Sequence, residues 1–266
     1  MNDSAPQAGR VDTHLHLLPG LDDGPPSLEE ALAMAEVAIA DGTTHAIATA
    51  HANYHFSFVP EQAAALCAEV QSRLGGRLQV ACGCEVHLSF ENVGMVLANP
   101  RLYSLNGSRY VLCEFPEFFE RHAMMSVLDR FRALALVPVL AHPERNPVFQ
   151  RDPDLLLEYL RLGCLSQVTA SSFHGRFGKV AQQFSHDLLQ QGRIHLVASD
   201  GHSADKRSPR LGRAQEWIEQ QQGPELAAML CAGNPMSVWL DRALAYTPSL
   251  SAGRKKSLWS RLRTHA

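Results

Sequence analysis

Short apolar runs alternate with longer stretches of helical periodicity along most of the chain. The first apolar run, Val11–His16, leads through a loop rich in Pro, Gly and Asp to a helix that begins at Ser27. Ser27 and Glu30 form a capping box there, positions 28, 31, 32, 35 and 39 form an apolar face, and Gly42 marks the helix end. The same order recurs, with further strands predicted over Thr44–His51, Arg77–Glu85, Tyr110–Glu114, Pro138–His142, Leu165–Thr169 and Ile194–Asp200.

Helical stretches separate most of these strands and follow the last one. The strands are near-continuous apolar runs, which is typical of parallel strands that are covered on both faces. Seven strand–helix units therefore predict an α/β fold with a closed or nearly closed barrel. An open doubly wound sheet is the alternative, but the chain has no glycine-rich phosphate-binding turn to support it. The predicted helices cover Pro60–Leu74, 122–136, Asp154–Leu162, 177–191, 210–221, 224–232 and 235–245.

Composition narrows the class of protein without naming an activity. The 24 Lys and Arg residues against 27 Asp and Glu residues leave a net charge of −3, so nothing indicates a nucleic-acid partner. No apolar run approaches the ~20 residues of a membrane helix, and the first residues lack the apolar region of a signal peptide. Six scattered cysteines do not form a disulfide framework. We therefore expect a cytoplasmic enzyme that does not span a membrane.

Side chains able to bind a metal recur at the ends of the predicted strands. In a β/α barrel the carboxyl ends of the strands converge on one face, where the chemistry takes place. Six of the seven predicted strands end in such a residue, which chance placement would rarely produce, and the remaining strand ends in the polar run Thr169–Ser172. The residues are His14, His16, His51, Glu85, Glu114, His142 and Asp200, with Asp23 and His202 just beyond two of the ends.

The spacing of His14 and His16 is the sharpest local signal. Residues two apart on a strand point to the same face, so both imidazoles enter one site. Histidine with carboxylate favours Zn, Mn or Fe, and five histidines with four carboxylates exceed the needs of one tetrahedral ion. The count predicts a cluster of two or three metals, which suits phosphoryl transfer. Amidohydrolases also use this motif, but the strand-end lysine that many of them carbamylate is missing.

Two arginines point to a phosphate ester as substrate. Arg145 follows His142, and Arg207 follows Asp200, so both fall beside the predicted metal ligands. A guanidinium group binds phosphate through two parallel hydrogen bonds. The spacing Cys67-x5-Arg73 would suggest a cysteine phosphatase, but Cys67 lies within a predicted helix and not in a phosphate-binding loop.

These motifs resemble the polymerase and histidinol phosphatase (PHP) superfamily. Within it, the chain is similar to the metal-dependent protein-tyrosine phosphatases of bacterial capsule and exopolysaccharide operons. The resemblance implies a distorted seven-stranded β/α barrel, which agrees with the strand count. It is carried, in the order of the family, by Val11–Gly24, Ala48–His51, Gly83–Glu85, Arg109–Phe115, Leu140–Arg145, Gln167–Lys179 and Ala198–Leu211.

The resemblance also assigns roles to individual residues. It implies two or three divalent ions, with manganese favoured over iron or zinc, and makes Arg145 and Arg207 the catalytic and substrate-binding arginines. Thr169–Ser172 and Ala52–His55 depart from the common form of the family, and both loops border the expected substrate cleft. The implied metal sites are His14, His16, Glu85 and Asp200; Glu85, Glu114 and His142; and Asp23, His51 and His202.

The resemblance implies a phosphotyrosine protein as substrate, in particular a bacterial tyrosine autokinase that controls polysaccharide synthesis. A phosphatase of histidinol phosphate or nucleotides, or a catalytically idle, metal-stabilised regulatory module, stays open as an alternative. We expect three segments: a flexible N-terminus (1–10), the phosphatase domain (11–246) and a basic tail (247–266). The tail could touch an anionic membrane surface or an acidic partner.

Overall fold

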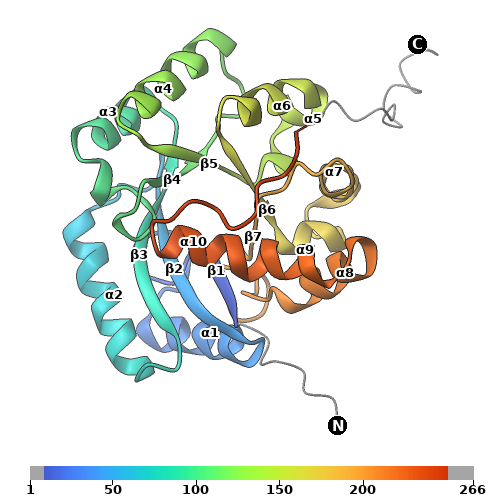
Figure 1. Cartoon of the computed structure of the whole chain (residues 1–266). Coiled ribbons are helices and arrows are strands. Elements are labelled where there is room, and N and C mark those ends of the chain that lie inside the picture. Colours follow the sequence, from blue (N-terminus) through green and yellow to red (C-terminus); the bar gives the residue numbers. More distant parts are fainter. Residues whose placement is uncertain (1–8, 251–266) are drawn as a thin grey trace.

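Seven parallel strands form a nearly closed barrel with helices around it, so the predicted α/β barrel is confirmed (Figure 1). The computed structural model describes residues 9–250, and neighbours in the sheet follow the order of the sequence. The strands are β1 (Arg10–Leu15), β2 (Thr43–Ala52), β3 (Gln79–His87), β4 (Tyr110–Glu114), β5 (Val137–Ala141), β6 (Leu165–Thr169) and β7 (Leu196–Ala198).

The barrel closes between its first and last strands through a few specific contacts. An isolated parallel bridge forms at the carboxyl ends, where the His16 N–H donates to the Gly201 carbonyl at 2.9 Å. Deeper in the barrel, the carboxylate of Asp12 accepts the backbone N–H of Ser199 at 3.0 Å. Asp12 is fully buried, and burial raises its pKa to about 6. A short backbone bridge at the carboxyl ends and this side-chain contact deeper in the barrel thus close the seam.

Eight helices of the described chain pack around the barrel, and their ends follow local sequence signals. The Ser27 hydroxyl accepts the Glu30 N–H at 3.3 Å, as the capping box predicts, and prolines begin α2, α5 and α6. The eight are α1 (Leu28–Ala40), α2 (Pro60–Leu74), α3 (Phe90–Ala98), α4 (Arg121–Ala133), α5 (Pro147–Arg151), α6 (Pro153–Arg161), α7 (Gly178–Gln190) and α8 (Gly212–Gln222).

The interior of the barrel is apolar at one end and polar at the other. A buried cluster inside it contains Ile47, Leu112, Val139, Leu165 and Leu196, one from each of five strands. Further along the same faces of β2 and β4, at the carboxyl ends, lie His51, four residues after Ile47, and Glu114, two residues after Leu112. The other end is covered by α10 (Asn234–Trp239), which follows α9 (Pro224–Ala228) and crosses the near end of the barrel in Figure 1.

The structure differs from the sequence prediction mainly in three places. Helices α3 and α5 were not predicted, because each is short and its start depends on a polar cap, Ser89 or Asn146. The helix predicted over 235–245 ends at Trp239. There Asp241 takes a left-handed backbone (φ 52°), and its carboxylate accepts both the backbone N–H and the Nε–H of Arg109 at 2.9 Å.

The predicted segments 1–10 and 247–266 fall mostly outside the described residues, which begin at position 9 and end at position 250. The proposed role of the basic tail therefore stays a prediction. None of the helices within residues 9–250 combines the length and the apolar character that crossing a membrane requires.

We predict that the barrel interior tolerates no added volume. In Gly83→Ala the new Cβ would lie 2.8 Å from Ile47 Cγ2 and 3.1 Å from Leu105 Cδ2, so the free energy of unfolding should fall by about 1–3 kcal/mol. The control is Gly94→Ala in α3, where no atom lies within 4 Å, and it should gain about 0.5–1 kcal/mol. Urea titration measures both changes, and a Gly83→Ala protein as stable as the wild type would contradict this packing.

Candidate metal centre

The nine predicted ligands meet at the carboxyl end of the barrel, although they come from six strands and the loops after them. Every residue of this set has a donor atom close to a donor atom of another member. Donor atoms within 4.8 Å of one another define three overlapping groups: His16, Asp23, His51 and His202; His14, His16 and Glu85; and His51, Glu85 and Glu114.

Glu85 lies at the centre of this arrangement. Its Oε2 atom is 3.1 Å from His14 Nε2, 3.2 Å from His16 Nε2 and 3.1 Å from His51 Nδ1, and its Oε1 atom is 2.8 Å from His142 Nε2. Burial alone would raise the pKa of this carboxylate, but the surrounding histidines, His14 first, hold the pKa well below its ordinary value. Glu85 therefore stays ionised, which is the form that a metal ligand requires.

Two buried side chains that the sequence analysis did not single out orient the paired histidines. Asp22 Oδ2 lies 2.7 Å from His16 Nδ1, and Gln167 Oε1 lies 2.8 Å from His14 Nδ1. Each acceptor fixes the proton on Nδ1 and leaves Nε2 as the donor to a metal. Asp22 also accepts the backbone N–H of His51 at 3.0 Å. The sequence analysis gave the adjacent Asp23 as a possible metal ligand, and no feature of the sequence indicated a separate role for Asp22.

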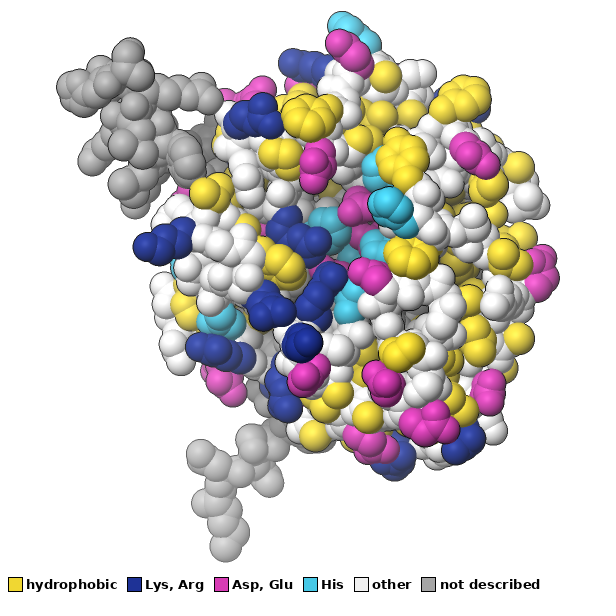
Figure 2. All heavy atoms as spheres, turned by 180° about the vertical axis from the view of Figure 1, so that it is seen from behind, with side chains coloured by type: hydrophobic (Ala, Val, Ile, Leu, Met, Phe, Trp, Pro, Cys, Tyr) yellow, Lys and Arg dark blue, Asp and Glu magenta, His cyan; other side chains and the backbone are white. Residues whose placement is uncertain are grey.

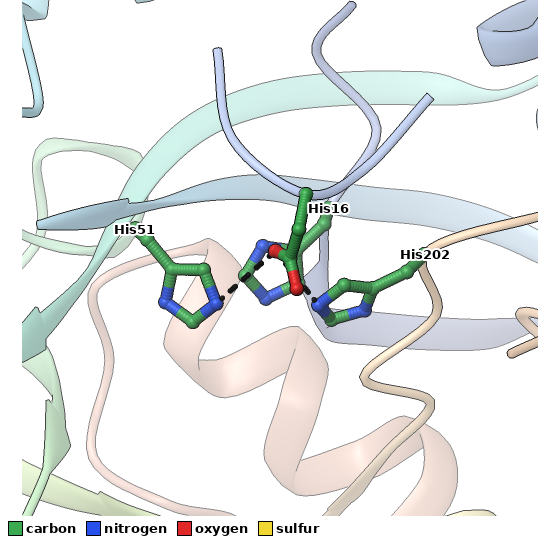
Figure 3. A group of neighbouring side chains, drawn as sticks. His16, His51 and His202 are labelled. Atoms are coloured by element: carbon green, nitrogen blue, oxygen red, sulfur yellow. Dashed lines mark ion pairs between the residues drawn. The ribbon is translucent and has the colours of Figure 1, made fainter. Parts of the chain in front are cut away.

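A second part of the site gathers around the carboxylate of Asp23. Figure 3 shows the rings of His16, His51 and His202 around a common point. Asp23 Oδ1 lies 3.4 Å from both His51 Nε2 and His202 Nε2. The Nδ1 atom of His202 is 3.0 Å from the Asp200 carbonyl, an arrangement that again directs Nε2 inward.

Buried ligand atoms that lack a hydrogen-bond partner test whether the nine predicted ligands fit metal ions. Glu85 Oε2, His51 Nδ1 and His202 Nε2 are buried without a hydrogen-bond partner within the described residues. In addition, the Nε2 atoms of His14 and His16 face each other at 3.1 Å. Buried polar atoms normally have partners, and imidazole with carboxylate is the donor chemistry of borderline divalent ions. The residues present therefore fit a metal cluster.

Two of the predicted ligands sit on strained backbone. His142 (φ 33°) and Asp200 (φ 51°) have left-handed conformations just after β5 and β7, and they are two of five such non-glycine residues in the described chain. This conformation costs an L-residue about 1–2 kcal/mol and persists where the surroundings impose it. Burial and the Arg145 charge lower the pKa of His142 to about 4, which keeps its imidazole neutral and able to bind a metal.

The structure distributes the donors differently from the three implied metal sites. Glu114 groups with His51 and Glu85, whereas the resemblance pairs it with Glu85 and His142. Burial and the nearby charge of Glu85 together raise the pKa of Glu114 to about 7. Asp200 Oδ1 lies 3.4 Å from His14 Nε2, beside the group of His14, His16 and Glu85. Which residues share an ion stays a prediction.

Arg145 and Arg207 both contact the predicted metal centre through hydrogen bonds to the Asp200 carboxylate. Arg145 Nη1 donates to Asp200 Oδ2, and Arg207 Nη2 donates to the same oxygen at 2.8 Å. The other oxygen of this carboxylate faces His14 and His16. The Arg145 guanidinium also stacks on the ring of Phe177 at 4.3 Å. Two guanidinium groups thus lie directly beside the predicted metal ligands.

The cysteine mechanism finds no support in the structure. Cys67 lies within α2 with an exposed fraction of 7%, and its thiol points to the Val80 carbonyl at 3.8 Å. Burial raises its pKa to about 12, so the thiol is protonated at neutral pH and is a poor nucleophile.

We predict that Asp22 is required for metal affinity. Asp22→Ala removes the acceptor of His16 Nδ1, so the affinity for the bound metals should fall about 10–100-fold. Competition with a chelating indicator measures the change, and circular dichroism checks the fold. Glu69→Ala, on the exposed face of α2, is the control and should bind metal like the wild type. An Asp22→Ala protein with unchanged affinity would show that Asp22 does not position His16.

Comparison with known proteins places this geometry in a family. Tyrosine-protein phosphatase YwqE of Bacillus subtilis is 35% identical over 228 residues, which are 83% of this chain and 88% of YwqE. Tyrosine-protein phosphatase CpsB of Streptococcus pneumoniae is 26% identical over 88% of this chain and its own full length.

Structure comparison gives the same result. A crystal structure from the study of YwqE and CpsB, described as metal-dependent tyrosine phosphatases, matches with a TM-score of 0.82 and 33% identity over 90% of this chain and 97% of the other. The sequence pattern of CpsB/CapC, a family of capsular polysaccharide synthesis, matches residues 10–240. This chain belongs to the CpsB/CapC family.

Proposed function

We propose that this chain is a metal-dependent phosphatase that hydrolyses phosphotyrosine in proteins. The observation that carries the proposal is the position of Asp200 between two groups. One of its oxygens faces the histidines, and the other accepts from Arg145 and Arg207. A phosphoryl group that displaces this contact would meet the two guanidinium groups next to the metal ligands. The names of the relatives YwqE and CpsB agree with this activity.

We further propose that the nine ligands hold two or three divalent transition-metal ions, manganese first, with iron or zinc as alternatives. Nine nitrogen and oxygen donors exceed the coordination of one ion, and His16, His51 and Glu85 each belong to two of the three groups. When bound, such ions supply Lewis-acid activation of a water nucleophile and neutralise charge on the phosphoryl group. Glu85, ionised and central, would help to hold more than one of these ions.

The chain's own cations would bind and stabilise the phosphoryl oxygens. A guanidinium group offers only donors and stays protonated, so Arg145 and Arg207 can hold phosphate but cannot be metal ligands. Phe177 supports the Arg145 fork from one side. The tyrosine leaving group has a pKa of about 10, low enough that a strong general acid is unnecessary. With bound metal ions, hydrolysis of an aryl phosphate would therefore need no strong general acid from the chain.

The rim of the site favours a protein as substrate over a small molecule. Tyr54, Phe90 and Phe118, in or just after the loops that follow β2, β3 and β4, are 78%, 94% and 75% exposed. Figure 2 shows the histidines and carboxylates in a hollow that is open to the surface. Exposed aromatic side chains around an open site offer contact area to a large partner. An enclosed pocket would instead suit histidinol phosphate or a nucleotide.

The physiological partner that we propose is a bacterial tyrosine autokinase of polysaccharide synthesis, and the proposed compartment is the cytoplasm. Membership of a capsular polysaccharide synthesis family supports this partner. All six cysteines are free, and five of them are buried, which agrees with a reducing compartment.

The arginines give the most specific test of this function. Arg145→Ala and Arg207→Ala should each keep the metal content of the wild type and lose about 10²–10³-fold in kcat/KM for a phosphotyrosine peptide. Lysine at either position should rescue only part of the activity, because it replaces the fork by a point charge. Metal analysis and kinetics on the same preparations measure both quantities.

Cys67→Ser is the matched control for this test and should retain activity. Arginine variants that lose metal, or that hydrolyse the peptide as fast as the wild type, would contradict the assigned roles. A folded but inactive Cys67→Ser protein would contradict the metal-dependent mechanism. Phosphotyrosine peptide, histidinol phosphate and nucleotides assayed side by side separate the proposed substrate class from its alternatives.

A further inference from the structure

We propose that a basic pocket beside the metal centre binds acidic side chains next to the phosphotyrosine of the substrate. This inference rests on the proposed function and adds the sequence context that the enzyme prefers. The pocket has a volume of about 280 Å³ and lies between the loop after β6 and the segment that runs from the end of β7 into the first turn of α8. The residues of the basic pocket that carry charge are Arg176, Lys206, Arg207, Arg210, Arg213 and Asp200.

The basic pocket carries far more positive than negative charge. Its one carboxylate, Asp200, is already bound by Arg145 and Arg207. Four cations, at positions 176, 206, 210 and 213, are exposed, and none of them forms an ion pair with a carboxylate of the described chain. Figure 2 shows Lys and Arg side chains gathered next to the histidines of the hollow. This local concentration of positive charge contrasts with the net charge of −3 for the whole chain.

Polar atoms without partners mark the wall of the same pocket. Arg207 Nε, Ser208 Oγ and His174 Nε2 are buried and lack a hydrogen-bond partner within residues 9–250. All three residues line the basic pocket. A buried polar group without a partner costs free energy, so unsatisfied groups in a pocket wall indicate a ligand that completes them. An anion would accept hydrogen bonds from the donors among them.

The position of the pocket links its ligand to the substrate. Arg207 contributes to both sites, because it contacts Asp200 at the metal centre and lines the basic pocket. Phe177, which lies under the Arg145 guanidinium, also lines it. A peptide whose phosphotyrosine reaches the metal centre would therefore bring neighbouring residues to the pocket. The cations there suit a carboxylate or a second phosphate on that peptide.

The test compares three peptides that carry one phosphotyrosine flanked on both sides by Glu, by Ser or by Lys. Wild-type enzyme with its metals should hydrolyse the Glu peptide with about tenfold higher kcat/KM than the Ser peptide at low salt, mainly through a lower KM. The preference should shrink in 0.5 M salt, since ions screen exposed charges. A Ser peptide with a second phosphotyrosine shows whether phosphate replaces carboxylate in the pocket.

Two double variants test whether the basic pocket causes the preference for the Glu peptide over the Ser peptide. In Arg210→Gln/Arg213→Gln the ratio of kcat/KM between the Glu and Ser peptides should fall toward one. In Arg210→Glu/Arg213→Glu the preference should reverse toward the Lys peptide, a gain that a loss of folding could not produce. The control Arg130→Gln/Arg161→Gln removes two exposed arginines of α4 and α6 and should keep the wild-type ratio.

The outcomes separate this inference from the proposed function. Equal kcat/KM for the Glu and Ser peptides would overturn the role of the basic pocket and leave phosphotyrosine hydrolysis intact. An acidic preference that survives in both pocket variants would likewise overturn it. If metal-loaded enzyme hydrolyses none of the peptides, the proposed function itself fails.

Discussion

The buried carboxylate of Glu85, surrounded by the nitrogens of four histidines, is the interaction on which the site depends. A charge removed from water is costly unless other groups compensate it, and here the compensation comes from residues on several different strands. The carboxylate can be ionised and central only if the barrel brings these strands together. The same convergence leaves several donors facing one another, which divalent ions would satisfy.

The strand geometry explains why one end of the barrel interior is apolar and the other end carries the polar side chains of the site. Because side chains alternate along a strand, a single inward-facing row on β2 passes from Ile47 to His51, and on β4 from Leu112 to Glu114. The apolar layer excludes water below the polar layer and is covered by Leu105 and by α10. His142 and Asp200, after β5 and β7, have a strained left-handed backbone, and this strain accompanies the inward direction of their side chains.

Much of this arrangement could be predicted from the sequence, and the remainder depends on contacts between distant segments. Apolar runs predicted the strands, and the polar residues at the strand ends predicted which side chains converge at the carboxyl end of the barrel, because both signals are local. The roles of Asp22 and Gln167 could not be predicted in this way. Each is one of many polar residues, and only the fold places it against Nδ1 of a histidine. The end of α10 was missed because it depends on the pairing of Asp241 with Arg109, which is 132 residues away.

The same limit applies to the basic pocket, whose cations come from the loop after β6 and from the segment between β7 and the first turn of α8, which are distant in the sequence. The central claim, a cluster of more than one ion held by nine ligands, is tested most directly by elemental analysis of active enzyme. More than one equivalent of transition metal per chain is expected, and hydrolysis of an aryl phosphate should disappear on chelation and return when metal is added back. Fully active enzyme that contains a single ion or none would contradict this account.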